Sequence, residues 1–286
     1  MIENLAKEYK VESLAPPEYK NLVGSQIGHS EDDNIYRIVP FTQFLSMLVN
    51  DENTLVHPSC WEDPFEKQLN NFLVKTKEGN NESHTEFEAN RWYAQCWSFK
   101  DNNDGLWRSF TNNKSVRSVK IQTTIRQLLD SWKPSKSSKT ELYLCNVYYS
   151  PEADYYKNVT ALAREYQIHL YKGMEPDSEA DEIQFVNELS LLTLKRDAFI
   201  HESECRLLAY RPRNYKKSSW SYKTNVNQLI SSVVFDPWTK DYEYDYLKKV
   251  LKEKMGYSGE IKPSLLYEDL KRPRTLTIER IQHNGF

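Results

Sequence analysis

Apolar residues recur along the chain with two different periods, and each period predicts a different kind of element. Alternating or short continuous apolar runs are typical of strands, and apolar residues spaced by three or four positions are typical of helices. Strands are predicted at 34–39, 54–57, 92–99, 115–122, 142–149, 204–210 and 232–235. Helices are predicted at 1–10, 41–49, 64–73, 104–110, 124–132, 152–172, 182–194 and 240–255, and a polar loop at 76–88.

The predicted strands and helices follow one another in mixed order, without the regular strand–helix–strand alternation of a doubly wound sheet. This order favours an α+β fold. A chain of 286 residues is longer than a typical domain and short for two domains. We therefore predict a single domain over residues 1–286.

Composition narrows the class of protein. Aromatic residues make up 13% of the chain, which is typical of a folded protein. The net charge of −3 gives no strong overall attraction to nucleic acid but leaves room for local basic patches. No apolar run approaches the roughly 18 residues of a membrane-spanning helix, and the polar start MIENLAKEYK is unlike a signal peptide. We expect a cytoplasmic protein without a membrane partner.

The sequence lacks the motifs of several common kinds of enzyme and metal site. The four cysteines, Cys60, Cys96, Cys145 and Cys205, form no C-x-x-C pair, and the six histidines form no H-x-x-x-H. We therefore predict free thiols and no metal site. The eight glycines form neither a G-x-x-x-x-G-K loop nor a G-x-G-x-x-G loop, and no G-x-S-x-G occurs. Glycine-loop phosphate binding and serine or metal hydrolysis are disfavoured.

Two candidate site residues lie within predicted strands. In Ile35-Tyr36-Arg37-Ile38, alternation separates Arg37 from Ile38, so the guanidinium either points to solvent or enters a cleft. In a cleft, its forked donors suit a diphosphate. Ser98, in the aromatic segment 95–99, either places its hydroxyl beside a ligand or bonds a neighbouring backbone group.

An acidic pair precedes the strand at 204–210. A period of two puts Glu202, Glu204 and Arg206 on one face. Carboxylates so close repel each other, and one pKa should rise unless a cation intervenes. Arg206 as that cation would make a surface salt-bridge ladder. The alternative is a catalytic carboxylate whose partner handles the protons of an acceptor.

Two further features leave alternatives open. Residues 211–223 carry five basic residues and no acidic ones, interleaved with aromatic rings; the candidate nucleic-acid contacts are Arg211, Arg213, Lys216, Lys217 and Trp220. Charge plus stacking suits single-stranded nucleic acid, and a solvated loop is the alternative. Trp107-Arg108, on a short predicted helix, either faces a cleft or belongs to packing, and Asp63 is a plausible cap at the turn 61–66.

Taken in order, several short motifs resemble a widespread bacterial family known as a domain of unknown function. The motifs are Tyr36-Arg37, Ser59–Glu66, Cys96-Trp97-Ser98, Leu106-Trp107-Arg108, Val119–Thr123, Lys195–Arg206 and Pro237-Trp238. The similarity covers about residues 34–240. It implies a core of that extent, followed by a helical and strand extension at 241–286.

The arginine, serine and glutamate clusters are also similar to the Arg–Ser–Glu signature of ADP-ribosyltransferases. This resemblance implies a mixed, split central sheet flanked by helices, with NAD as co-substrate. It implies that Arg37 holds NAD, Ser98 orders the pocket and Glu204 bonds the nicotinamide ribose. Glu202 would orient or deprotonate the acceptor.

The same resemblance implies an aromatic ring stacked on the nicotinamide. Tyr36, Trp61 and Trp107 are the candidates, and Arg108 is the neighbouring candidate for cofactor binding.

The leading hypothesis is therefore NAD-dependent ADP-ribosyl transfer to a macromolecule. The basic–aromatic stretch favours RNA or another nucleic acid as acceptor, with protein as the alternative. By analogy with bacterial transferase toxins, it implies a toxin or anti-phage effector with a neutralising antitoxin. The alternatives are a non-catalytic module that senses a nucleotide or phage component, and a nuclease in which Glu202, Glu204 and Asp63 hold a divalent ion.

Overall fold

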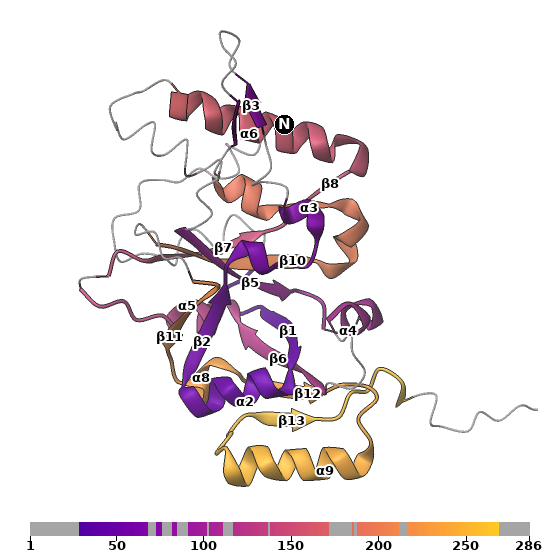
Figure 1. Cartoon of the computed structure of the whole chain (residues 1–286). Coiled ribbons are helices and arrows are strands. Elements are labelled where there is room, and N and C mark those ends of the chain that lie inside the picture. The colour runs from indigo at the N-terminus through magenta and orange to yellow at the C-terminus, as the bar shows by residue number, and fades with distance from the viewer. Residues whose placement is uncertain are drawn as a thin grey trace, which may run out of the picture.

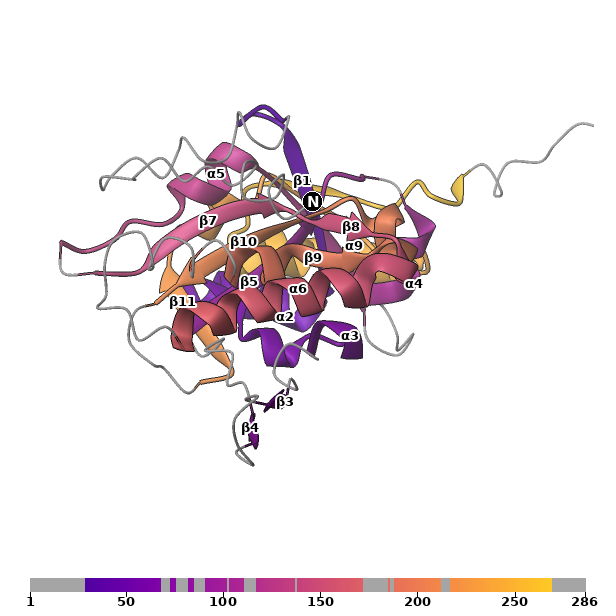
Figure 2. The same ribbon diagram turned by 90° about the horizontal axis from the view of Figure 1, so that it is seen from above.

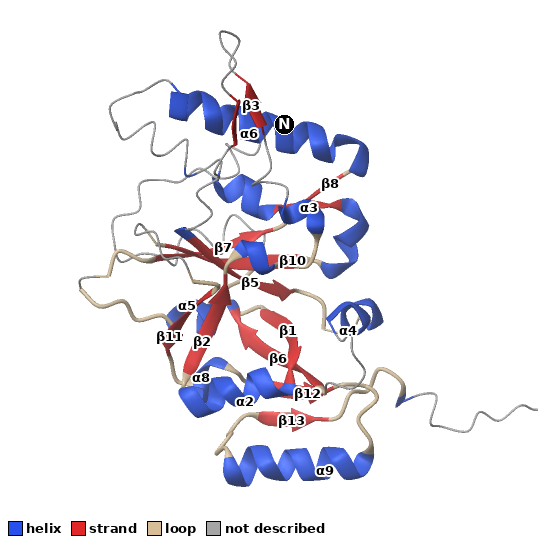
Figure 3. Ribbon diagram, viewed as in Figure 1, coloured by secondary structure: helices blue, strands red, loops and turns tan. Residues whose placement is uncertain are grey.

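A computed structural model of the chain describes residues 29–67, 73–75, 82–84, 91–101, 103–110, 117–136, 138–171, 185, 188–211 and 217–268. These residues form a large mixed sheet with helices packed on both of its faces (Figures 1 and 3). The α+β class predicted from the order of elements is confirmed.

The central sheet contains nine strands within the described part of the chain. Seven of them follow the order β11 (Ser219–Lys223), β2 (Glu52–Val56), β5 (Trp92–Ser98), β1 (Asn34–Pro40), β6 (Ser118–Thr124), β12 (Ser232–Phe235) and β13 (Glu260–Lys262). The other two are β10 (Glu204–Tyr210), which pairs with β5, and β7 (Glu141–Asn146), which pairs with β10. The pairs are antiparallel except for the parallel pair β12–β13.

The sheet branches at β5. One edge of β5 pairs with β10 along its whole length, from Trp92 to Ser98. Its other edge is shared, because Ala94 pairs with β2 and Ser98 pairs with β1. Strands β1 and β2 therefore diverge from the same edge, and the sheet is split as expected.

Helices cover the two faces of this sheet and enclose separate cores. On one face lie α2 (Phe41–Asn50), α5 (Ile125–Asp130) and α8 (Val226–Leu229), packed on strand residues such as Ile121 and Leu207. On the other face lie α6 (Glu152–Tyr171) and the helical residues 188–193, packed on Trp92 and Leu208. Figure 2 shows α6 crossing over β9 and β10. Burying each such large apolar side chain stabilises the fold by about 1.5–3 kcal/mol.

The remaining elements lie at the margins of the sheet. Helix α4 (Asp104–Phe110) lies beside the end of β1 and packs Trp107 against Ile38 (Figure 1). The other helical elements are η1 (Pro58–Cys60), α3 (Pro64–Lys67), η4 (Asp197–Glu202), α9 (Asp241–Lys249) and the π-helical turn η5 (Val250–Lys254). Two small sheets pair β3 (Leu73–Lys75) with β4 (Glu82–His84) and β8 (Tyr148–Ser150) with β9 (Leu194–Arg196).

Local capping explains several boundaries. Thr124 and Gln127 form a reciprocal capping box at the start of α5. The Asp63 carboxylate accepts from the Phe65 backbone N–H at 2.9 Å, as expected of a cap. At α4, Asn103 takes this role, because its side-chain oxygen accepts from the Gly105 N–H at 2.8 Å.

Several predicted boundaries are wrong because partner strands decide them. The single strand predicted at 142–149 is two strands, since β7 stays in the central sheet and β8 leaves it to pair with β9. The helix predicted at 64–73 is described only as far as Lys67, and its last predicted residue, Leu73, lies in β3. Strand β4 replaces part of the loop predicted at 76–88, and β11 lies within 211–223, for which a solvated loop was one alternative. The helix predicted at 1–10 lies outside the described residues.

All four cysteines are free thiols, and two of them, Cys145 and Cys205, are buried. Among the described helices, none combines the length and apolar character that a membrane crossing requires.

Candidate active site

The three candidate clusters meet at the branch of the sheet. Ser98 of β5 is the register partner of Tyr36 in β1 and of Glu204 in β10. Residues directly opposite each other on neighbouring strands project to the same face. Tyr36, Ser98 and Glu204 therefore form one row across three adjacent strands.

A cleft lies beside this row; about 370 Å³ of empty space, open solvent included, surrounds it. It is lined by Tyr36, Arg37, Ile38, Cys96, Trp97, Ser98, Lys100, Leu106, Phe110, Lys120, Glu202 and Glu204. The lining has three cationic residues, two carboxylates and several apolar side chains. Five of the predicted site residues belong to it: Tyr36, Arg37, Ser98, Glu202 and Glu204.

Arg37 lines this cleft from β1. The side chain is half-buried, and it has no hydrogen bond or ion pair with any residue that the structure describes. Burial lowers its pKa to about 10, an effect that the nearby Cys96 opposes. The guanidinium nevertheless stays charged at neutral pH. A cation in a cleft with unused donors is suited to bind an anionic ligand.

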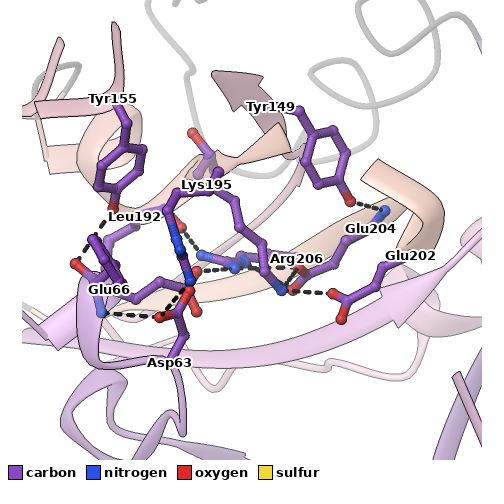
Figure 4. Close-up of polar contacts among 12 residues, drawn as sticks. Asp63, Glu66, Tyr149, Tyr155, Leu192, Lys195, Glu202, Glu204 and Arg206 are labelled. Carbon is purple, nitrogen blue, oxygen red and sulfur yellow. Dashed lines mark hydrogen bonds and ion pairs between the residues drawn. The ribbon is translucent and has the colours of Figure 1, made fainter. Parts of the chain in front are cut away.

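Glu204, by contrast, accepts hydrogen bonds at both carboxylate oxygens, and only 5% of the residue is exposed. Lys195 donates to its Oε2 at 2.9 Å, and Arg206 donates to its Oε1 at 2.9 Å (Figure 4). Burial alone would raise its pKa, but Arg206 and Lys195 outweigh that effect and lower the pKa to about 2. Glu204 is therefore ionised at neutral pH.

Glu202 shares Lys195 with Glu204. The Lys195 ammonium donates to Glu202 Oε2 at 2.6 Å, so it lies between the two carboxylates (Figure 4). Burial raises the pKa of Glu202, and Lys195 only partly offsets this effect. The two carboxylates therefore differ in character, because Glu204 holds its charge firmly while Glu202 takes up a proton more readily. Such a division suits one residue that stabilises charge and one that exchanges protons.

Arg206 anchors the other side of the acidic pair. It is 1% exposed, and its guanidinium donates to Glu66, to the Leu192 backbone oxygen at 2.6 Å and to Glu204. The Trp61 ring lies 4.2 Å from the guanidinium. Counting formal charges, the three carboxylates Glu66, Glu202 and Glu204 face two cations, Lys195 and Arg206.

These contacts contradict the surface-ladder alternative for the acidic pair. The pairs are buried, not exposed, because α3 and the helical residues 188–193 close over Arg206. Strand alternation does apply to Glu204 and Arg206. Glu202 instead belongs to η4, and Ser203, with a left-handed φ of 45°, turns the chain into β10.

Ser98 acts on the backbone of this turn. Its hydroxyl donates to the Glu202 carbonyl at 2.6 Å and accepts from the Lys100 N–H at 3.0 Å. The backbone alternative considered for this serine therefore holds. The same bond ties the residue that carries the Glu202 carboxylate to β5.

Three predicted cofactor residues lie outside the cleft lining and have other contacts. Trp61 packs on Arg206, and Trp107 packs with Ile38 in the core beside α4. Arg108 is exposed and forms an ion pair with Asp104 at 2.6 Å.

The basic–aromatic stretch is only partly described. Trp220 lies in β11, packs its ring 5.2 Å from the ring of Trp132, and has Arg211 5.5 Å from its own ring. Lys217 is exposed, and its backbone oxygen accepts from the Tyr93 hydroxyl at 3.2 Å. Arg213 and Lys216 lie outside the described residues.

Three cations of the site had no predicted role. Lys195 links the carboxylates from β9, and Lys100 and Lys120 line the cleft. For Lys120 and Lys195 the available signal was their position in the quoted motifs, since Lys120 lies within Val119–Thr123 and Lys195 begins the segment that ends at Arg206.

The carboxylates show no metal-ligand arrangement. Within the described ranges, no group of three or more His, Cys, Asp or Glu residues is placed to hold a metal ion. Asp63, which the nuclease hypothesis joins to the glutamates, faces Arg196 at 3.5 Å.

The fold and the cleft together define an α+β protein with a split sheet and a cleft that is lined by both cationic residues and carboxylates. No protein-family model matches the chain, and no curated protein matches it by sequence. Among solved structures, the chain is similar to Thermus sp. 2.9 DarT in complexes with carba-NAD⁺ and with ADP-ribosylated ssDNA. The first match has 10% identity, a TM-score of 0.37 and coverage of 82% of this chain and 97% of that chain. The second has 9% identity, a TM-score of 0.36 and coverage of 82% and 95%. At these identities and TM-scores, only the residues of this chain bear on the chemistry of its cleft.

Proposed function

We propose that this protein is an NAD-dependent ADP-ribosyltransferase whose active site is the cleft between Arg37 and Glu204. One observation carries the proposal: a guanidinium without a protein partner among the described residues shares a cleft with a buried, ionised carboxylate. NAD has a matching distribution of charge, with an anionic diphosphate and a cationic nicotinamide riboside. The lining also offers apolar surface for a ring, from Leu106 and Phe110.

In the proposed reaction, the bond between the ribose C1′ and the nicotinamide nitrogen breaks, and nicotinamide leaves with the bonding electrons. Positive charge develops on the ribose, and the ionised Glu204 carboxylate stabilises it by charge and by a hydrogen bond to a ribose hydroxyl. The acceptor then bonds to C1′ and releases its proton. Glu202, with its raised pKa, is suited to take that proton. Ser98 holds Glu202 in place through its backbone.

The acceptor is proposed to be a nucleic acid, with protein as the alternative. Support comes from the basic and aromatic residues at 211–223, where Lys217 is exposed and Arg211 lies beside Trp220. A transferase of this kind would be toxic to its own cell, so we further propose a toxin or anti-phage role and a neutralising partner.

The test is transfer of label from adenylate-labelled NAD to single-stranded DNA, RNA or lysate protein. We expect labelled macromolecule with wild-type protein and a loss of about 100-fold or more with Glu204→Gln, since removing one such electrostatic group commonly costs 10²–10³ in rate. Glu260→Gln, an exposed carboxylate on β13, is the matched control. Label that stays on small molecules with every acceptor, using folded protein, would contradict the proposal.

A second candidate, a nucleotide-sensing module without catalysis, is favoured by one feature of Glu204. Both of its carboxylate oxygens already accept bonds from Lys195 or Arg206. If the module hypothesis holds, Glu204→Gln binds NAD and retains the cellular effect of the wild type. If transfer is the function, the variant binds NAD and loses toxicity.

A further inference from the structure

Lys120 of β6 is a buried cation that lines the cleft, and the reaction proposed above gives it no role. Its side chain is 5% exposed, and it pairs in register with Ile38 of β1. The ammonium lies 5.2 Å from the centre of the Tyr36 ring. A lysine so far removed from solvent needs a nearby negative charge, because an unpaired buried ammonium is strongly destabilising.

Asp101, which follows the cleft residue Lys100 in the chain, supplies that charge. The Lys120 ammonium donates to the Asp101 carboxylate and, at 2.8 Å, to the Asp101 backbone oxygen. The Asp101 side chain is 55% exposed. An exposed carboxylate is readily hydrated when it leaves its partner, so the cost of opening this pair falls on the buried Lys120 ammonium, and an incoming anion that takes the place of Asp101 offsets it. The buried Arg206–Glu204 pair lacks that freedom.

Arg37 and Lys120 approach the cleft from neighbouring strands. Arg37 pairs with Ile121, one residue from Lys120, so strict alternation would point the two cations to opposite faces of the sheet. Both nevertheless line the cleft, which opens where β1 parts from β5 beyond the Tyr36–Ser98 pair. Besides Lys100, the cleft is lined by Arg37, which has no ion pair with a described residue, and by Lys120, whose partner Asp101 is exposed.

We propose that Arg37 and Lys120 form a two-point site for a diphosphate, and that Asp101 is the counter-ion which the diphosphate displaces. The proposal rests on the function proposed above and deepens it by naming the part of the ligand that the cleft selects. The cleft should prefer nucleoside diphosphates such as ADP-ribose to monophosphates such as AMP. The charge-assisted bonds of two cations favour two phosphates over one.

The experiment is titration calorimetry with ADP-ribose and AMP, which needs no catalysis. Lys120→Met keeps the aliphatic stem and removes the charge. We expect it to weaken ADP-ribose binding about 10- to 100-fold, the range of a lost hydrogen bond to a charged group. The affinity of Lys120→Met for AMP should differ from that of the wild type by at most about threefold. Lys262→Ala, which removes a lysine from an exposed pair with Glu260, is the matched control.

Asp101→Asn tests whether a diphosphate displaces the Asp101 carboxylate from Lys120. If the diphosphate displaces Asp101, Asp101→Asn should strengthen ADP-ribose binding about two- to fivefold, because the ligand no longer competes with a carboxylate for Lys120. The Asp101 backbone oxygen still accepts from Lys120 in this variant. Weaker binding by Asp101→Asn would overturn the displacement. Wild-type protein that binds ADP-ribose while Lys120→Met binds it within about twofold would overturn the role of Lys120 and leave the proposed function standing. Wild-type protein that binds neither ADP-ribose nor NAD would overturn both.

Discussion

Arg37 and Glu204 line the same cleft although they come from β1 and β10, two strands that do not pair with each other. Strand β5 joins them, because Ser98 pairs with the neighbour of Arg37 on one side and with Glu204 on the other. The two side chains have opposite surroundings. Glu204 is enclosed by cations, whereas Arg37 has no ion pair with a described residue. This contrast leads to distinct expectations for their substitution.

Substitution of Arg37 should reduce ligand binding without reducing stability. A half-buried cation without a protein acceptor among the described residues contributes little to folding, so Arg37→Met should leave the free energy of unfolding unchanged or raise it by about 1 kcal/mol. NAD affinity should fall about tenfold or more. Thermal unfolding and calorimetry measure the two quantities. A destabilised Arg37→Met with wild-type affinity would assign the guanidinium a structural role.

Substitution of Arg206 should have the reverse effect. Arg206→Met leaves Glu66 and Glu204 buried without their shared cation, and breaking such a buried pair destabilises a fold by about 3–5 kcal/mol. Urea unfolding measures the loss. Arg108→Ala is the control, because its ion pair with Asp104 is exposed and its removal should leave the unfolding midpoint unchanged. Equal midpoints for both variants would show that the buried network does not support the fold.

The two glutamates should give opposite pH dependences of stability. The folded-state pKa of Glu204 is lowered to about 2, so its stabilising contribution is present above its unfolded pKa of roughly 4.3 and is lost as pH falls towards 2. The folded-state pKa of Glu202 is raised, so its contribution is present at low pH and is lost as pH rises through the folded pKa.

Glu202→Gln isolates the second effect. Its stability relative to wild type should increase as pH rises from about 4 to neutral, because the variant no longer has a carboxylate that ionises unfavourably. Urea unfolding at a series of pH values measures this difference. A difference that stays constant across that range would mean that Glu202 ionises as readily in the fold as in the unfolded chain.

Removal of the Ser98 hydroxyl should slow transfer more than it weakens NAD binding. Ser98→Ala loses the bond to the Glu202 carbonyl and frees the turn that carries the Glu202 carboxylate. We expect turnover to fall about tenfold or more, the lower range for a misplaced acid–base group, with NAD affinity within about threefold of wild type. Ser221→Ala, which removes an exposed hydroxyl bonded to Thr54, is the control. Equal losses in affinity and turnover would place Ser98 in direct contact with NAD.

Much of the secondary structure was predictable because it depends on local pattern. The bounds of β10, β12 and α4 agree with those expected from apolar spacing, and β1 differs by one residue. Residue type also singled out Arg37, Ser98 and Glu204, since an arginine or an acidic pair is unusual in an apolar strand. Strands such as β9 and β13, of three residues each, were not predicted, because so short a run has no measurable period.

What the local pattern leaves open is which residues become neighbours. Period two correctly placed Glu204 and Arg206 on one face, but whether that face is exposed depends on α3 and residues 188–193, which cover it in the fold. Because that face is buried, Glu204, Arg206 and Lys195 form a buried network that lowers the pKa of Glu204, and not the surface ladder that was one alternative. Lys195 and Lys120 belong to the site because β9 and β6 lie next to segments that are distant in the sequence. The sequence by itself determined which residue types and local elements are present, and only the tertiary structure decided their partners and their exposure to water, on which their charges depend.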